Sequence, residues 1–124
     1  MNVIDSSGWL EYFVDGPNAS IFQSALQDTT HLIVPTVCMY EVFKRLLSFV
    51  AVEKAAQFVE IMRQGRTISF DESLALQAAL ISRQYQLALA DAIIYTTALT
   101  HSAQLWTQDA HFKGLANVQF IEKK

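Results

Sequence analysis

The most constraining feature of this sequence is the regular alternation of short apolar, β-rich segments with longer segments whose apolar residues recur at helical spacing. Strands are expected at residues 3–4, 32–34, 67–70, 105–107 and 118–121. Helices are expected around residues 9–13, 19–26, 37–47, 51–64, 71–81 and 89–101. Strands that are separated by helical crossovers run parallel, and helices then cover both faces of the sheet. We therefore predict an α/β domain with a central parallel sheet of about five strands.

Capping residues divide this pattern into elements. Ser6 and Ser7 are suited to cap the first helix, Thr36 the third, and Asp71 the long helix that follows the third strand. Gly65 is suited to end the helix before it. With 124 residues the chain has room for one hydrophobic core, so we expect a single domain over residues 1–124.

Composition and charge limit the functional classes. Hydrophobic residues make up 52% of the chain, yet no segment has the roughly 20 apolar residues that span a bilayer. The start Met-Asn-Val-Ile-Asp does not resemble a secretory signal, so we expect a cytoplasmic protein. The net charge of −3 argues against a simple nucleic-acid binder, because Lys and Arg supply most of the affinity for phosphates. A nuclease escapes this objection if bound cations offset its acidic residues.

The cysteine and the histidines do not form a recognisable zinc site. Cys38 is the only cysteine and has apolar neighbours, which favours a small buried thiol over a nucleophile. His31, His101 and His111 share neither a helical face nor a ligand spacing, so we expect them to be structural or exposed. His111 comes two residues after the acidic residue 109, and it is kept as a candidate for contact with substrate.

Two aspartates follow predicted strands. Asp5 comes directly after the first strand, and Asp109 lies two residues beyond the fourth. Because sites in parallel sheets form at the carboxyl ends of the strands, these carboxylates can lie close together. The alternative is that each caps a helix, which is a frequent role for Asp after a strand.

Two further carboxylates lie in apolar helical segments. Asp91 has no Lys or Arg between Arg83 and Lys113, so its partner has to be a distant group or a cation. Glu41 lies in a mostly apolar segment but is followed by Lys44 and Arg45. A helical ion pair with one of these two residues is therefore the alternative for Glu41.

Four converging carboxylates would repel one another and raise their own pKa values. A hard divalent cation removes this conflict, and oxygen ligands suit Mg²⁺ or Mn²⁺. The sequence thus favours a magnesium site, with Mn²⁺ as a substitute.

Four segments carry a resemblance to a known family: Val3-Ile-Asp-Ser-Ser-Gly-Trp-Leu, Tyr40-Glu-Val, Leu89-Ala-Asp-Ala-Ile-Ile-Tyr and Thr107-Gln-Asp-Ala-His-Phe. Their order and spacing resemble those of PIN domains of the VapC-type toxin group, over residues 3–121. The resemblance implies a PIN-like three-layer α/β/α domain with strand order 3-2-1-4-5. Carried over residue by residue, the metal-binding acids fall on Asp5, Glu41, Asp91 and Asp109, and supporting hydroxyls fall on Ser6 and Thr107.

The resemblance further implies the toxin of a type II toxin–antitoxin system. Its activity would be Mg²⁺-dependent endoribonuclease cleavage that leaves 5′-phosphates, with Asp5 and Asp91 as the central ligands. It would form a homodimer and bind a VapB-type antitoxin, for which residues 43–50 and 55–62 offer docking helices; packing in the core explains their apolar residues equally well. Candidate residues for guiding the RNA are Lys44, Arg45 and Lys113. Capping a helix and ending a strand are equally good explanations for Ser6 and Thr107.

Two other functions compete with this hypothesis. A non-catalytic PIN-like module that binds RNA or protein would be expected to have lost part of the acidic set, yet all four positions are acidic. A phosphatase with Asp5 as its nucleophile would be expected to carry Asp-x-Asp, but Ser7 stands at the second position.

Overall fold

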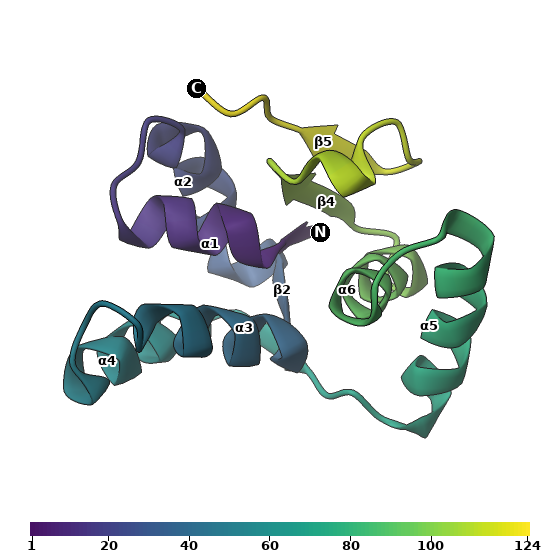
Figure 1. Ribbon diagram of the computed structural model, residues 1–124, viewed down its shortest axis with the longest axis horizontal. Coiled ribbons are helices and arrows are strands. Elements are labelled where there is room, and N and C mark those ends of the chain that lie inside the picture. The colour runs from purple at the N-terminus through teal and green to yellow at the C-terminus, as the bar shows by residue number, and fades with distance from the viewer.

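The computed structural model describes all 124 residues and contains one five-stranded parallel sheet in the order β3-β2-β1-β4-β5 (Figure 1). The strands are β1 (Asn2–Ile4), β2 (Leu32–Pro35), β3 (Arg66–Ile68), β4 (Gln104–Thr107) and β5 (Val118–Phe120). The helices are α1 (Ser6–Phe13), α2 (Ala19–Gln27), α3 (Thr36–Leu46), α4 (Val52–Met62), α5 (Glu72–Tyr85) and α6 (Leu89–Thr100), with short 3₁₀ turns η1 (Thr29–His31) and η2 (Ala110–Phe112). Helices α1 and α2 lie on one side of the sheet, and α5 and α6 lie on the other (Figure 1). The predicted α/β/α fold and strand order are confirmed.

Three local predictions were wrong. Asp5 caps α1, and Ser6 is already the first helical residue. Thr36 likewise lies inside α3, whose N-cap is Pro35 and has no side-chain bond. The third strand ends at Ile68 rather than at residue 70, because Ile68 pairs with Pro35, the last residue of β2. The predicted cap of α5 is confirmed, since Asp71 accepts a hydrogen bond from the Leu74 N–H over 2.9 Å.

The core surrounds the central strands and takes buried residues from all six helices, with the largest share from α6. Val3 and Ile4 of β1 are fully buried, and all four residues of β2 are buried as well. Every residue of α6 from Ala92 to Ala98 is buried, which agrees with the apolar sequence on all sides of this helix. No helix has the length and apolar character needed to cross a membrane.

The sheet brings the ends of β1 and β4 together. Ile4 pairs with Trp106, and the Asp5 N–H donates to the Trp106 carbonyl over 3.1 Å. The first turn of α1 packs tightly onto this edge through Gly8. A Cβ at Gly8 would lie 2.6 Å from Ile4 Cγ2 and 2.8 Å from Phe22 Cε1, so any larger side chain would displace its neighbours. The chain therefore leaves β1 with Asp5 held beside the end of β4.

Candidate metal centre

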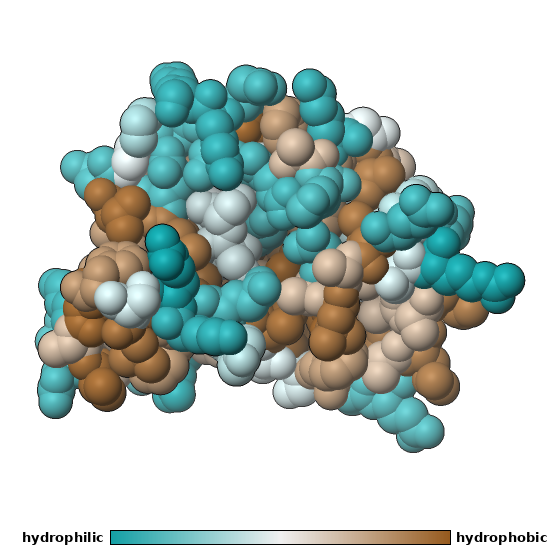
Figure 2. Space-filling view, viewed as in Figure 1, coloured by the Kyte–Doolittle hydropathy of each residue, from teal (hydrophilic) through white to brown (hydrophobic).

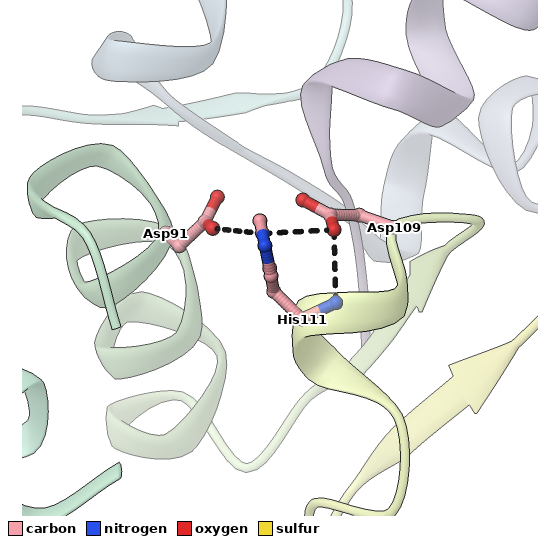
Figure 3. Close-up of side chains that lie close together, drawn as sticks. All are labelled: Asp91, Asp109 and His111. Carbon is pink, nitrogen blue, oxygen red and sulfur yellow. Dashed lines mark hydrogen bonds and ion pairs between the residues drawn. The ribbon is translucent and has the colours of Figure 1, made fainter. Parts of the chain in front are cut away.

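Asp91, Asp109 and His111 meet at the edge of the sheet where β1 and β4 end (Figure 3). His111 Nδ1 lies 3.1 Å from an Asp109 carboxylate oxygen and 3.5 Å from an Asp91 oxygen. The same Asp109 oxygen accepts the His111 backbone N–H over 2.9 Å, so Asp109 caps the turn η2. One ligand atom from each of the three residues lies within 4.8 Å of the others, close enough for one ion to contact all three.

Asp5 is the most deeply buried of the four predicted acids. Its carboxylate accepts hydrogen bonds from the Ser7 hydroxyl over 2.6 Å and from the Gly8 N–H over 3.2 Å. Burial raises its pKa from the ordinary 3.8 to about 7, against the lowering effect of hydrogen bonds from Ser7, Thr107 and Gly8, and the charge of Asp109 raises it further. Asp5 is therefore both a helix cap and an acidic group beside the other carboxylates, so the two interpretations of this residue are compatible.

Asp91 lies in the first turn of α6 and is half-buried rather than enclosed, with its side chain 18% exposed. Burial raises its pKa to about 6; the charges of Asp109 and Glu41 raise it further, and His111 lowers it. The missing partner of Asp91 within the chain is thus His111, which η2 places beside α6. The only sign of this contact in the sequence is the position of His111 two residues after Asp109.

Glu41 is bound to α1 and not to the basic residues that follow it on α3. The Ser6 hydroxyl donates to a Glu41 carboxylate oxygen over 2.6 Å. Lys44, the alternative partner, instead places Nζ 5.7 Å from the centre of the Tyr40 ring. Because the charge of Glu41 acts on the pKa of Asp91, Glu41 contributes to the same negative field. Its ligand atoms, like those of Asp5, lie outside the tightest cluster.

Hydroxyl groups fix the backbone and carboxylates around this site. Thr107 is fully buried, and its Oγ1 accepts the Asp109 N–H over 2.9 Å. Ser7, which sequence reasoning considered only as a cap, donates to Asp5 and accepts the Gln108 N–H over 3.2 Å. This serine therefore ties α1 to the loop after β4, and only the three-dimensional structure reveals this role.

Cys38 lies beneath the acidic site and is fully buried, with Sγ 3.7 Å from the Ile4 carbonyl. Burial raises the pKa of its thiol well above the usual range, and the charges of Asp5 and Glu41 add to the effect. Because the thiolate is the nucleophilic form of cysteine, this environment makes Cys38 inert.

The three basic residues predicted to guide RNA are exposed, and none forms an ion pair. Arg45 lines a surface hollow together with Ser7 and Gln108. Lys113 has its Nζ 5.4 Å from the centre of the Phe120 ring. Of the three side chains, Arg45 thus shares a surface with a residue that holds Asp5.

The site combines four carboxylates with one imidazole. Such an oxygen-rich set suits a hard divalent cation better than zinc, which favours Cys and His ligands. A cation among these groups would also relieve the repulsion and burial that raise the pKa values of Asp5 and Asp91. The donors present therefore fit Mg²⁺ or Mn²⁺.

Comparisons with known proteins agree with this description. A family model described as the PIN domain matches residues 3–118. A toxin–antitoxin complex from Klebsiella pneumoniae is similar in structure, with a TM-score of 0.84, 18% identity and 100% of both chains covered. VapC20 of Mycobacterium tuberculosis, described as a toxin that cleaves the sarcin–ricin loop, has a TM-score of 0.76 and 14% identity, with 98% of both chains covered.

A DNA-bound VapBC complex from Salmonella typhimurium has a TM-score of 0.74 and 12% identity, with 97% of this chain and 96% of that chain covered. No curated protein matches the sequence. At these identities the solved structures establish a shared fold.

Proposed function

The chain belongs to the PIN-domain family, and from this membership we propose that it is the toxin of a type II toxin–antitoxin pair and acts as a metal-dependent endoribonuclease. The main support is the convergence of Asp91 and Asp109 beside Asp5 and Glu41, at the edge where β1 and β4 end. The acids come from the start of α1, from α3 and from α6, which are distant in sequence, and from the start of the turn η2. A non-catalytic module would have no need to keep so many partly buried acids together.

Asp5, Glu41, Asp91 and Asp109 would hold Mg²⁺, or Mn²⁺ in its place. When bound, such an ion makes water a better nucleophile and stabilises negative charge on a phosphodiester. The residues of this chain would orient the ligands: Ser6 holds Glu41, Ser7 holds Asp5, and Thr107 fixes the backbone of Asp109. Cleavage would leave a 5′-phosphate on the RNA.

Positive side chains near the site would hold the RNA backbone. Arg45 is the best placed, because it shares a hollow with Ser7, whose hydroxyl bonds to Asp5. Lys44 and Lys113 would add weaker, non-specific attraction to phosphates. His111 lies against two of the acids and would contact the substrate or the metal.

The partner would be a VapB-type antitoxin, as the presence of toxin–antitoxin complexes among similar structures suggests. A groove of about 700 Å³ lies between α3 and α4, and its apolar lining residues are Met39, Tyr40, Phe43, Ala56 and Val59. The apolar surface over these helices is visible at the lower left of the molecule (Figure 2). An antitoxin helix would bury its apolar face there, against the helix α3 that also carries Glu41.

We also propose that the toxin is a cytoplasmic homodimer and that the chain is one PIN domain throughout.

The experiment that tests the activity uses purified chain and total cellular RNA, with Mg²⁺, with Mn²⁺ and with EDTA. The site variant is Asp5→Asn, and the matched control is Asp71→Asn, because Asp71 caps α5 in the way that Asp5 caps α1. Discrete metal-dependent cuts with 5′-phosphate ends, lost only in Asp5→Asn, are expected. If folded wild-type protein makes no cuts in any RNA, the nuclease proposal is wrong.

A further inference from the structure

A small surface hollow adjoins the acidic site beside α1 and α3, two helices that lie against each other (Figure 1). Its lining residues include Ser7, Leu10, Glu11, Arg45, Phe49 and Gln108. The volume of the hollow is about 270 Å³, a little below the roughly 300–1,000 Å³ of sites for drug-sized ligands. Ser7 connects it to the acids, because the Ser7 hydroxyl donates to Asp5 and accepts the Gln108 N–H. A small ligand in this hollow would therefore lie next to the proposed metal centre.

The side chain of Gln108 presents unused hydrogen-bond donors at this hollow. It is only 9% exposed, and its Oε1 accepts a hydrogen bond from Asn18 Nδ2 over 3.0 Å. Asn18 Nδ2 also donates to the Glu122 carbonyl over 3.0 Å, and because a carbonyl can only accept, the orientation of both amides is determined. Gln108 Nε2 has no partner within the chain and is not sealed from solvent. Two N–H groups of a largely buried side chain are thus left for a ligand.

Glu11 lines the same hollow with a carboxylate that is held in place. Its Oε2 accepts the Asn18 backbone N–H over 2.7 Å, and its Oε1 has no hydrogen-bond partner. Any side chain at Gly16 would collide with this carboxylate, so glycine makes its position possible. Asn18, the fully buried N-cap of α2, makes no side-chain bond to its own helix and binds Gln108 instead. One buried residue therefore holds both an acceptor and a pair of donors at the wall of the hollow.

The other lining residues suit a flat ring attached to a phosphate. Phe49 is 53% exposed and forms no aromatic contact within the chain, so its ring is free to stack. Leu10 adds aliphatic surface, and Arg45 has no ion pair and can hold a phosphate. Unpaired RNA bases are recognised by stacking on aromatic side chains together with hydrogen bonds to their edges. The hollow thus has the chemistry of a subsite for one nucleobase.

We propose that this hollow binds a guanine base of the RNA, next to the phosphodiester that the metal centre would cleave. Guanine carries the acceptor O6 beside the donors N1–H and N2–H₂. Gln108 Nε2 donates to O6, and Glu11 accepts from N1–H and N2–H₂. Adenine and cytosine place an amino group where guanine has O6, so donor would meet donor. Uracil has a carbonyl beside an N–H but lacks the additional amino group, so it should bind with intermediate affinity.

This inference rests on the proposed nuclease function and adds a base preference to it, but nucleosides test it without metal, phosphate or cleavage. Isotope-labelled chain in EDTA would be titrated with guanosine, inosine, uridine, adenosine and cytidine, and the Gln108 side-chain amide would be followed by NMR. Guanosine should shift this resonance and bind about tenfold more tightly than adenosine or cytidine. Inosine lacks the amino group of guanine, so it should bind more weakly than guanosine.

Two variants each change one wall of the hollow. Glu11→Gln keeps an oxygen for the Asn18 N–H but turns an amide toward the N–H groups of guanine, and it should weaken guanosine binding about tenfold. Phe49→Ala removes the stacking surface and should weaken guanosine and uridine binding alike, by about tenfold. The matched controls are Glu53→Gln, at an exposed glutamate of α4, and Phe70→Ala, at a phenylalanine that is 47% exposed. Both controls should bind guanosine as the wild type does.

Circular dichroism establishes that each variant is folded before it is compared. Guanosine binding that is weakened in both variants and unchanged in both controls would support the subsite, whether or not the chain cleaves RNA. Equal affinity for all five nucleosides, no shift of the Gln108 amide, or unchanged guanosine affinity in Glu11→Gln would overturn it. RNA cleavage by a chain that does not bind guanosine would likewise overturn the subsite and leave the nuclease proposal standing.

Discussion

Replacing Asp5 by Asn should stabilise the metal-free protein at high pH while removing its activity. Burial is the main reason that the pKa of Asp5 rises from 3.8 to about 7 in the folded chain. A raised folded-state pKa means that the folded protein binds the proton more tightly than the unfolded one. The associated stability is present below about pH 4 and is lost as the pH rises through about 7. Three pKa units correspond to at most roughly 4 kcal/mol at pH 8.

Asn at this position keeps an oxygen that can accept the Gly8 N–H and the Ser7 hydroxyl, but it carries no charge. Urea unfolding in EDTA at pH 5 and pH 8 measures the effect. The wild type should lose stability between the two pH values, and Asp5→Asn should lose much less. Asp71→Asn, at an exposed cap, should follow the wild type. If Asp5→Asn is destabilised at pH 8, or if its pH dependence equals that of the wild type, the electrostatic reasoning is refuted.

The other predictions concern packing and ligand positioning. Asp91→Asn should abolish cleavage and leave the circular dichroism spectrum unchanged; an unfolded variant would mean that Asp91 is structural. Ser6→Ala removes the donor to Glu41 and should slow cleavage by about tenfold with a small loss of stability, and an unchanged single-turnover rate would contradict this role. Gly8→Ala should lower the free energy of unfolding, measured in urea, by about 1–3 kcal/mol, because its Cβ would collide with Ile4 and Phe22. An unchanged urea midpoint would contradict this prediction, since it would mean that both side chains move aside at no cost.

The fold could be predicted because its signals are local and repeated. The apolar strands and the helical spacing of apolar residues place each element within a few residues, and parallel crossovers limit the topology. At the start of α1 the prediction failed because neighbouring residues competed for one role. Asp5, Ser6 and Ser7 are all good caps, and only the packing of α1 on the sheet selects Asp5.

The site could be predicted only as a set of acidic residues, and its contacts could not. Glu41 has two basic neighbours on its own helix, so local reasoning offered an ion pair, whereas its partner Ser6 lies 35 residues away. His111 meets Asp91 because η2 packs next to α6, and no pattern in the sequence encodes that distance. Ser7 acts through its contacts to Asp5 and to the Gln108 backbone, which depend on the register of β1 and β4.

Whether the converging carboxylates form a divalent-metal centre can be decided by anomalous scattering, because it locates the ion itself. Crystals of the chain would be soaked in Mn²⁺ and measured near the manganese absorption edge. We expect a peak at ligand distance from carboxylate oxygens of Asp5 and Asp91, with Asp109 beside it, and no such peak in Asp91→Asn crystals. A wild-type crystal without a manganese peak among these residues, or with the same peak in Asp91→Asn, would contradict the metal centre.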